Sequence, residues 1–421
     1  MSVRRPGSGC PRKVEIGGRG SRTVTSLLSP IRFPSFLVSS VSSVSSVSSV
    51  VYDLLREVEM KLTIKNIRAR AVLVPLKRPP VSASGALPEA ALVLVDLDAG
   101  EGITGHSYLA AYGKAMLKPL VSTTEAVAEM IEGDALVPYE IDAKLRKRFT
   151  LFDTPGLVGL ALAGIDMAVW DAYAKGLGVP LVCALGGQIR PVRAYNSCGL
   201  WIKDPGLLAD EAAELLSEGG YSAVKLRIGR PDFKNDLAAV RNVKKRIGDA
   251  ISLMTDFNQS QTVTEAIKRG RALDDEGLYW IEEPVRHDDY AGCAKIALEV
   301  KTPIQIGENL LNTFEMQKAI EAGAAEYYMP DVQRIGGVTG WMRAAALAHA
   351  HHLEMSSHLF PEISAHLLAV TPTCHWLEYM DWANPILQEP FEIKNGNAII
   401  PDRPGAGIAW NEDAVQRFAA A

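Results

Sequence analysis

The sequence predicts an α/β fold in which a (β/α) barrel follows an α+β domain. From about residue 190 to residue 380, short apolar runs alternate with helix-like stretches. Residues 60 to about 185 instead combine long strand-like segments with Ala/Leu-rich stretches of helical spacing. In addition, each of the short apolar runs carries an ionisable residue near its C-terminal end.

The first 59 residues differ from the rest in composition. Residues 38–51 read VSSVSSVSSVSSVV, and the segment before them has seven basic residues against one acidic residue, Glu15. A basic, Ser-rich, acid-poor start resembles an organelle transit peptide, whereas a start codon assigned too early would make Met60 the true first residue. Both interpretations exclude 1–59 from the fold, because low-complexity sequence of this kind cannot bury a core.

Residues 60–188 are expected to form the α+β domain. LTIKNIRARAVLVPL (62–76) and ALVLVDLDAGEGITGHSYL (91–109) are typical of strands that contain a turn between them. TTEAVAEMIEG (123–133) and LVGLALAGIDMAVWDAYAKGLG (157–178) have the spacing of helices.

Residues 189–384 are expected to form the barrel. The apolar runs are SAVKLRI (222–228), ISLMTDF (251–257), LYWIEEP (278–284), TPIQIGEN (302–309), EYYMPDV (326–332), EMSSHLF (354–360) and CHWLEYM (374–380). Strand–helix alternation indicates a parallel sheet with helices outside, and seven or eight units close most naturally into a barrel. The alternative is a doubly wound open sheet, which is less well supported because neither G-x-G-x-x-G nor G-x-x-x-x-G-K-[ST] is present.

The ionisable residues at the strand ends point to one site. They are Lys225, Arg227, Asp256, Glu282, Glu283, Glu308, Asp331, His358 and Glu378. Any one of them alone would be interpreted as a helix N-cap or a solvated rim residue. Because the C-terminal strand ends of a barrel face one mouth, the whole set is expected to converge there.

Three of these residues suggest a metal site. Asp256, Glu282 and Glu308 would repel one another strongly without a cation, and hard oxygen ligands select Mg²⁺ over zinc. Asn258 lies two residues beyond Asp256, where it could orient that ligand or simply form a turn.

The other residues suggest proton abstraction next to a carboxylate. A carboxylate such as Asp331 fixes the tautomer of His358 and raises its basicity, so the histidine can act as a base. Lys225 and Arg227 share one face of their strand and would neutralise a substrate carboxylate. Glu378, kept protonated by its neighbours, could donate a hydrogen bond to the developing enolate. The set therefore predicts removal of the α-proton of a small carboxylate.

Composition argues against several other partners. The net charge of −5 and the aromatic content of 7% give no support for binding nucleic acid or an anionic membrane. We find no apolar run long enough to span a bilayer. The five cysteines are scattered and include no C-x-x-C pair, which indicates free thiols in the cytoplasm and no zinc site.

The chain resembles the enolase superfamily and, within it, the mandelate racemase group, from about residue 60 to the C-terminus. The resemblance is carried by AVKLRIG, MTDFNQS, WIEEP, IGEN, MPDVQRIGGVTGW, MSSHLFPEISAHLLA and HWLE. It implies a (β/α)7β barrel beneath an α+β capping domain, to which residues 385–421 return. It also implies homo-oligomers, often octamers.

The resemblance implies a role for each site residue. Asp256, Glu282 and Glu308 would be the Mg²⁺ ligands, the His358–Asp331 dyad one base, and Glu378 the electrophilic acid. Lys225 and Ser197 would contact the substrate carboxylate. The implied pocket lining comprises Tyr112, Leu87, Leu359 and Met380.

One departure leaves the reaction open. The group carries K-x-K on the second strand, where the second lysine is a base for one substrate face, but this chain has Arg227 there. Arginine stays protonated and is a poor base, which favours the one-base chemistry of acid-sugar dehydratases. The apolar capping segment PPVSASGALP (79–88) instead favours mandelate-racemase-like racemisation of an aromatic or aliphatic 2-hydroxy acid. Racemisation is therefore the first expectation, and an acid-sugar dehydratase that uses His358 as its single base is the alternative.

Overall fold

The computed structural model describes residues 62–152 and 154–420. The two interpretations of residues 1–59 lie outside the described residues. These residues form a three-stranded antiparallel sheet, a two-stranded hairpin and one large sheet that contains the barrel.

The barrel consists of eight parallel strands that follow one another around the ring. They are β6 (Val192–Asn196), β7 (Ala223–Arg227), β8 (Ser252–Asp256), β9 (Ile281–Glu282), β10 (Ile304–Ile306), β11 (Tyr327–Tyr328), β12 (Glu354–Met355) and β13 (Leu377–Tyr379). β13 pairs with β6. The ring closes where Met355 bridges to Cys374 and the amide of Ser357 donates to the carbonyl of Trp376.

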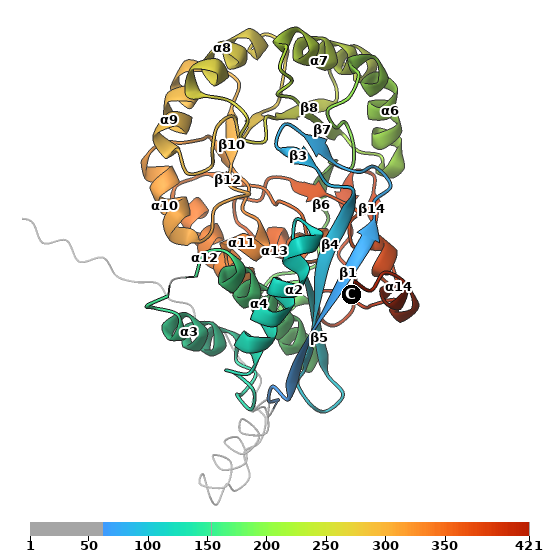
Figure 1. Cartoon of the computed structure of the whole chain (residues 1–421), viewed down its shortest axis with the longest axis vertical. Helices are drawn as coiled ribbons and strands as arrows, with labels where there is room; N and C mark the ends of the chain where they lie inside the picture. Colours follow the sequence, from blue (N-terminus) through green and yellow to red (C-terminus); the bar gives the residue numbers. More distant parts are fainter. Residues whose placement is uncertain (1–61, 153, 421) are drawn as a thin grey trace, which may run out of the picture. The chain divides into compact units, whose positions relative to one another are not determined.

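Helices follow the first seven strands and form the outer wall (Figure 1). They are α6 (Leu208–Gly219), α7 (Phe233–Ile247), α8 (Val263–Leu273), α9 (Tyr290–Glu299), α10 (Thr313–Glu321), α11 (Val332–Ile335) with α12 (Gly337–Ala350), and α13 (Pro361–Val370). Side chains cap several of their N-termini, as when Asp232 accepts from the Lys234 amide and Asn312 from the Glu315 amide. The predicted (β/α)7β barrel is therefore confirmed, and the doubly wound alternative is wrong.

The interior of the barrel is layered because side chains alternate along each strand. An apolar cluster of Tyr195, Ala223, Met254, Trp280 and Trp376 fills one layer. Each member precedes by two positions a polar residue of the layer above, namely Ser197, Lys225, Asp256, Glu282 and Glu378. The same strands thus provide a packed aromatic layer and, two residues closer to their C-terminal ends, a layer of polar and charged residues.

The capping domain is built on the antiparallel sheet of β1 (Asn66–Pro75), β4 (Glu89–Asp98) and β5 (Thr104–Ala110). Its helices are α2 (Lys114–Ala128), α3 (Pro138–Arg148), α4 (Leu157–Gly176) and α5 (Leu181–Ala184). α4 packs on β5, α2 and α12, so it joins the sheet to the barrel. The fold with an N-terminal capping domain and a C-terminal barrel agrees with the prediction.

Helix α4 is long and apolar enough to cross a membrane, contrary to the expectation that no apolar run has that length. Most of it is buried inside the protein, and its Asp166 accepts hydrogen bonds from the backbone and hydroxyl of Thr339 on α12. These contacts identify α4 as a core helix.

The last stretch of chain contacts both parts of the molecule. The hairpin of β14 (Ile393–Lys394) and β15 (Asn397–Ala398) pairs with β6. After α14 (Glu412–Arg417), the carbonyl of Phe418 accepts from Leu73 and the amide of Ala420 donates to Ala71 on β1. The boundary predicted at 188/189 lies between α5 and β6 and stays a prediction.

Candidate active site

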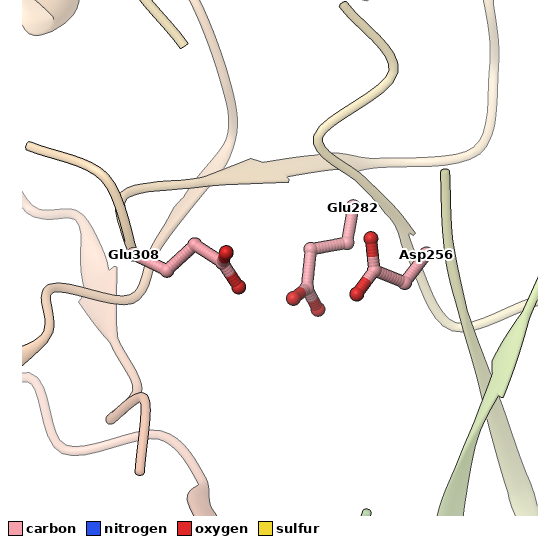
Figure 2. Close-up of side chains that lie close together, drawn as sticks. All are labelled: Asp256, Glu282 and Glu308. Carbon is pink, nitrogen blue, oxygen red and sulfur yellow. The ribbon is translucent and has the colours of Figure 1, made fainter. Parts of the chain in front are cut away.

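Three carboxylates face one another at the C-terminal ends of adjacent barrel strands (Figure 2). Asp256 ends β8, Glu282 ends β9, and Glu308 follows β10 by two residues. Their ligand oxygens lie within 4.8 Å of one another. Asp256 and Glu282 are buried, whereas Glu308 is half-buried. The structure thus brings together the residues predicted from the sequence to bind a metal.

The electrostatics of the triad fit a hard divalent cation. Burial, together with the nearby carboxylates of Asp256, Glu308 and Glu378, holds the pKa of Glu282 well above its usual range, although Lys225 opposes this effect. A cation bound among the oxygens would remove that repulsion, and an all-oxygen ligand set is the kind that Mg²⁺ prefers. These residues would therefore hold Mg²⁺.

Asn258 fulfils both of the roles considered for it. Its backbone has a φ of 45°, as in a turn residue. Its backbone N–H donates to Oδ1 of Asp256 at 2.7 Å, and its side-chain Nδ2 donates to Oδ2 of Asp256 at 2.9 Å. The turn therefore places two donors on Asp256 and fixes the orientation of that carboxylate.

Lys225 is fully buried beside the triad. Its Nζ lies 2.7 Å from Oε1 of Glu282, 2.8 Å from Oε1 of Glu378 and 3.4 Å from Oδ2 of Asp256. Burial alone would lower the pKa of Lys225, but these carboxylates outweigh it and raise the pKa well above its usual value. Lys225 is therefore a cation here and is not available as a base.

His358 and Asp331 form the predicted dyad. Nδ1 of His358 lies 2.6 Å from Oδ2 of Asp331, and its Nε2 lies 3.2 Å from Oε2 of Glu308. Burial would lower the pKa of His358, but the carboxylates of Glu308, Glu378 and Asp331 together raise it to about 9. The other oxygen of Asp331 caps α11 by accepting from the amides of Gln333 and Arg334, so this residue is both an N-cap and a histidine partner.

Arg227 is held in place by the loop after β6. Its Nη1 donates to the carbonyls of Ser197 (2.9 Å) and Gly199 (3.1 Å), and its Nη2 donates to Oγ of Ser197 (2.8 Å). The guanidinium also stacks on Trp201, with Cζ 3.9 Å from the ring centroid. Ser197 in turn donates to Glu378 at 2.7 Å. Ser197 is not among the residues that line the cavity, so its contact with a substrate carboxylate stays a prediction.

The contacts of Glu378 bear on its expected role as a neutral acid, which stays a prediction. We expected a neutral acid, but the carboxylate accepts hydrogen bonds from Ser197 Oγ and the Leu359 amide and forms an ion pair with Lys225. Burial would raise its pKa, yet the cations Lys225, His358 and Arg227 hold the pKa of Glu378 well below its usual range. These contacts favour the ionised form of Glu378.

A cavity of about 260 Å³ opens above these residues. Its charged floor includes Lys225, Arg227, Asp256, Glu308, His358 and Glu378, and its apolar walls include Leu87, Tyr112, Leu359 and Met380, as predicted, together with Trp201 and Trp382. The two tryptophans were missed, because their positions follow from loop geometry and not from a sequence period. Trp382 stands two residues after Met380, and this spacing is the one signal in the sequence that points to it.

The hairpin of β2 (Val81–Ser82) and β3 (Gly85–Ala86) covers the cavity. It lies over the barrel in Figure 1. The amide of Ile202 donates to the carbonyl of Val81 at 2.8 Å, and the hydroxyl of Ser84 donates to the carbonyl of Asn258. Few polar side chains of the hairpin remain free to bind substrate hydroxyls.

Two family descriptions match the chain. Residues 64–186 match the mandelate racemase / muconate lactonizing enzyme N-terminal domain, and residues 207–414 match the enolase C-terminal domain-like family. Together the two matches include every residue of the carboxylate triad and of the His358–Asp331 dyad.

The proteins similar to this chain include a dehydratase and two enolases of known structure. The chain is 31% identical over 332 residues to the L-talarate/galactarate dehydratase of Salmonella typhimurium, covering 78% of this chain and 82% of that protein. An enolase from alpha proteobacterium bal199 with bound magnesium has 44% identity and a TM-score of 0.84, covering 85% of this chain and 100% of that one. A Bradyrhizobium enolase complexed with magnesium and mandelic acid has 41% identity and a TM-score of 0.82, covering 86% and 99%.

Proposed function

The chain belongs to the mandelate racemase / muconate lactonizing enzyme family of the enolase superfamily. From this premise we propose that it is a magnesium-dependent enzyme, which removes an α-proton from one face of a 2-hydroxy carboxylate. His358 is the base. Asp256, Glu282 and Glu308 would hold Mg²⁺, which when bound would withdraw electron density from the substrate carboxylate and acidify the α C–H bond. Relatives with bound magnesium support this assignment.

The dyad supplies the proton transfer. Asp331 accepts the Nδ1–H of His358 at 2.6 Å, so Nε2 is the nitrogen that faces the site. The base is the neutral imidazole: the carboxylate of Glu308 is among the charges that raise the pKa of His358, and Mg²⁺ bound to Glu308 would offset that charge and favour the neutral form. After the transfer, the carboxylate of Asp331 stabilises the imidazolium. Lys225, as a buried cation, supplies positive charge beside the negative charge that develops on the substrate.

Arg227 supports chemistry with a single base. Its guanidinium makes three hydrogen bonds to Ser197 and Gly199 and stacks on Trp201. Arginine is protonated at all ordinary pH values, so it cannot take a proton from the second face. Racemisation requires a base on each face, whereas elimination requires only one.

We therefore favour dehydration of a 2,3-dihydroxy carboxylate whose remaining substituent is small or apolar. His358 removes the α-proton, the β-hydroxyl leaves as water with a proton returned by the imidazolium, and the resulting enol tautomerises to a 2-keto acid. The S. typhimurium dehydratase supports this reaction type. The apolar walls disfavour a substrate with many hydroxyl groups.

A second candidate is racemisation of an aromatic 2-hydroxy acid. The walls formed by Leu87, Leu359 and Met380, together with the relative that binds mandelic acid, favour it. This reaction would require a second base, and neither Lys225 nor Arg227 has a free lone pair in the structure.

Proton NMR in D₂O separates the two. The protein with Mg²⁺ is incubated with each enantiomer of mandelate and with a panel of 2,3-dihydroxy acids and acid sugars. Release of a 2-keto acid, or exchange of one enantiomer only, is the expected result. Interconversion of both mandelate enantiomers would contradict the one-base proposal and establish racemisation.

We also propose that the enzyme is a cytoplasmic homo-oligomer. The four cysteines among the described residues are all free thiols, which supports a reducing compartment. Leu151 and Phe152 are exposed by 103% and 75%, and exposed apolar side chains of this size are frequent at subunit contacts. Light scattering on the purified protein measures its mass, and a monomer of 45.5 kDa would contradict the oligomer.

A further inference from the structure

Trp280 lies directly beneath the carboxylate triad, in the aromatic layer of the barrel. It is fully buried and precedes Glu282 by two positions, so both side chains point into the barrel. Its Nε1–H donates a 3.1 Å hydrogen bond to Oε2 of Glu282, while Nζ of Lys225 donates to Oε1 at 2.7 Å. Each oxygen of Glu282 therefore accepts a hydrogen bond from a different donor.

The surrounding rings leave the indole no freedom to turn. Tyr195 packs edge-on at 5.5 Å between centroids, Tyr279 at 5.3 Å and Tyr327 at 6.3 Å. His375 packs against it at 5.9 Å. The donor that faces Glu282 is therefore fixed by packing, and it does not depend on any bound group.

We propose that Trp280 is a positioning residue for Glu282. The terminal torsion of a glutamate is soft, and rotation of its carboxylate is the freedom that the indole N–H removes. The hydrogen bond holds the carboxylate where it faces Asp256 and Glu308 (Figure 2). A site arranged before the ion arrives loses less entropy on binding, so Trp280 raises the affinity for Mg²⁺. This inference rests on the magnesium site of the proposed function.

The barrel contains a matched control, Trp376. It belongs to the same apolar layer, precedes Glu378 by two positions and is 3% exposed. Its Nε1 has no hydrogen-bond partner in the described part of the chain. Trp280→Phe and Trp376→Phe thus remove the same atoms from the same layer, but only the first removes a hydrogen bond to a carboxylate.

Titration calorimetry with Mg²⁺ on metal-stripped protein tests the inference without any substrate. Outer-shell partners of metal ligands typically change affinity by about 10- to 100-fold, and we expect a loss of that size for Trp280→Phe. Trp376→Phe should bind Mg²⁺ like the native protein. Equal affinity in all three proteins, or equal losses in the two variants, would overturn the inference. Absence of binding by the native protein would instead overturn the proposed function.

A second substitution removes the risk that Trp280→Phe fails to fold. Replacing the indole of residue 280 by benzothiophene, through incorporation of benzothienylalanine, puts sulfur where the N–H was and keeps the volume of the ring system. This protein should fold and unfold cooperatively without metal and show the same loss of Mg²⁺ affinity. Native affinity for Mg²⁺ in this variant would contradict a role for the hydrogen bond.

Discussion

Nδ1 of His358 lies 2.6 Å from Oδ2 of Asp331, and this contact orients the base of the proposed reaction. The histidine is on the loop after β12 and the aspartate on the loop after β11, so the neighbouring strands of the barrel bring them together.

His358→Asn should abolish exchange of the α-proton. General acid–base groups typically contribute a factor of about 10²–10⁴ to the rate, and His358 is the only imidazole among the described residues that line the cavity. Exchange is followed by proton NMR in D₂O. Mg²⁺ binding should persist, because the triad is intact, and calorimetry provides that control. Exchange at the native rate would exclude His358 as the base.

Arg227→Lys should create weak exchange on the second face while lowering the overall rate. A lysine cannot make the three hydrogen bonds to Ser197 and Gly199 or stack on Trp201, but it can lose its proton. The measurement is deuterium incorporation into each enantiomer of a 2-hydroxy acid. Arg241→Lys on the exposed surface of α7 is the control. Second-face exchange by the native protein would contradict the prediction.

Residues at the strand ends could be predicted because the barrel has a repeat. A charged residue at the end of each apolar run predicts one site at the C-terminal mouth of the barrel, and this prediction does not require knowledge of how the side chains pack. The triad and the dyad lie at that mouth. For Asp331 and Asn258, the cap or turn interpretation and the site interpretation were weighed as alternatives, yet both apply. In Asp331, one carboxylate oxygen caps α11 while the other accepts from His358. In Asn258, the backbone N–H at the turn and the side-chain Nδ2 both donate to Asp256.

The parts that the sequence did not predict depend on non-repeating geometry and on summed charge. Trp201 and Trp382 reach the cavity from loops, and no pattern of hydrophobicity reveals their positions. Leu359 and Tyr112 were expected in the pocket, but their left-handed backbone, with φ values of 49° and 51°, was not. The charge on Glu378 depends on the cations Lys225, His358 and Arg227 as well as on its carboxylate neighbours, and the apolar runs of the sequence do not show how these charges sum.

Glu378→Gln should destabilise the protein and slow proton exchange. The amide cannot form the ion pair with Lys225 or accept as well from Ser197 and the Leu359 amide. Removing one partner of a buried ion pair typically costs about 3–5 kcal/mol, and urea unfolding measures it. Glu354→Gln, which changes an exposed carboxylate, is the control. Full activity in Glu378→Gln would instead support the neutral acid first expected.

Removal of Mg²⁺ should lower stability without unfolding the barrel. A ligand that binds only the folded state, at 100 times its dissociation constant, adds about 2.7 kcal/mol. The added stability has a local source, because the ion relieves repulsion among Asp256, Glu282 and Glu308. Thermal melts with Mg²⁺ and with EDTA measure the difference, which should disappear in Glu308→Gln and persist in the surface variant Glu129→Gln. A difference that survives in Glu308→Gln would locate the ion elsewhere.

His375 should make the folded state weaker in acid. It is buried in the aromatic layer, where Tyr279 and Ser356 contact its two ring nitrogens. Burial and then the cation of Arg193 lower the pKa of His375 from 6.5 to about 3. The nearest acid, Glu354, is half exposed and lies 3.8 Å away. In the unfolded chain the same imidazole takes up a proton near pH 6.5.

Between pH 6.5 and pH 3 the unfolded state therefore binds one more proton than the folded state, and stability falls as the pH falls. The slope is about 1.4 kcal/mol per pH unit, or about 2 kcal/mol between pH 6.5 and 5. His375→Gln lacks this proton and should show a shallower slope in urea unfolding from pH 7.5 to 5, whatever its stability at pH 7.5. Burial also lowers the pKa of His366, to about 4. His366 contributes the same slope of unfolding free energy against pH to the native protein and to the variant, so its effect cancels in the comparison. The exposed His351→Gln should keep the native slope; an equal slope in His375→Gln would mean that the buried imidazole is already charged.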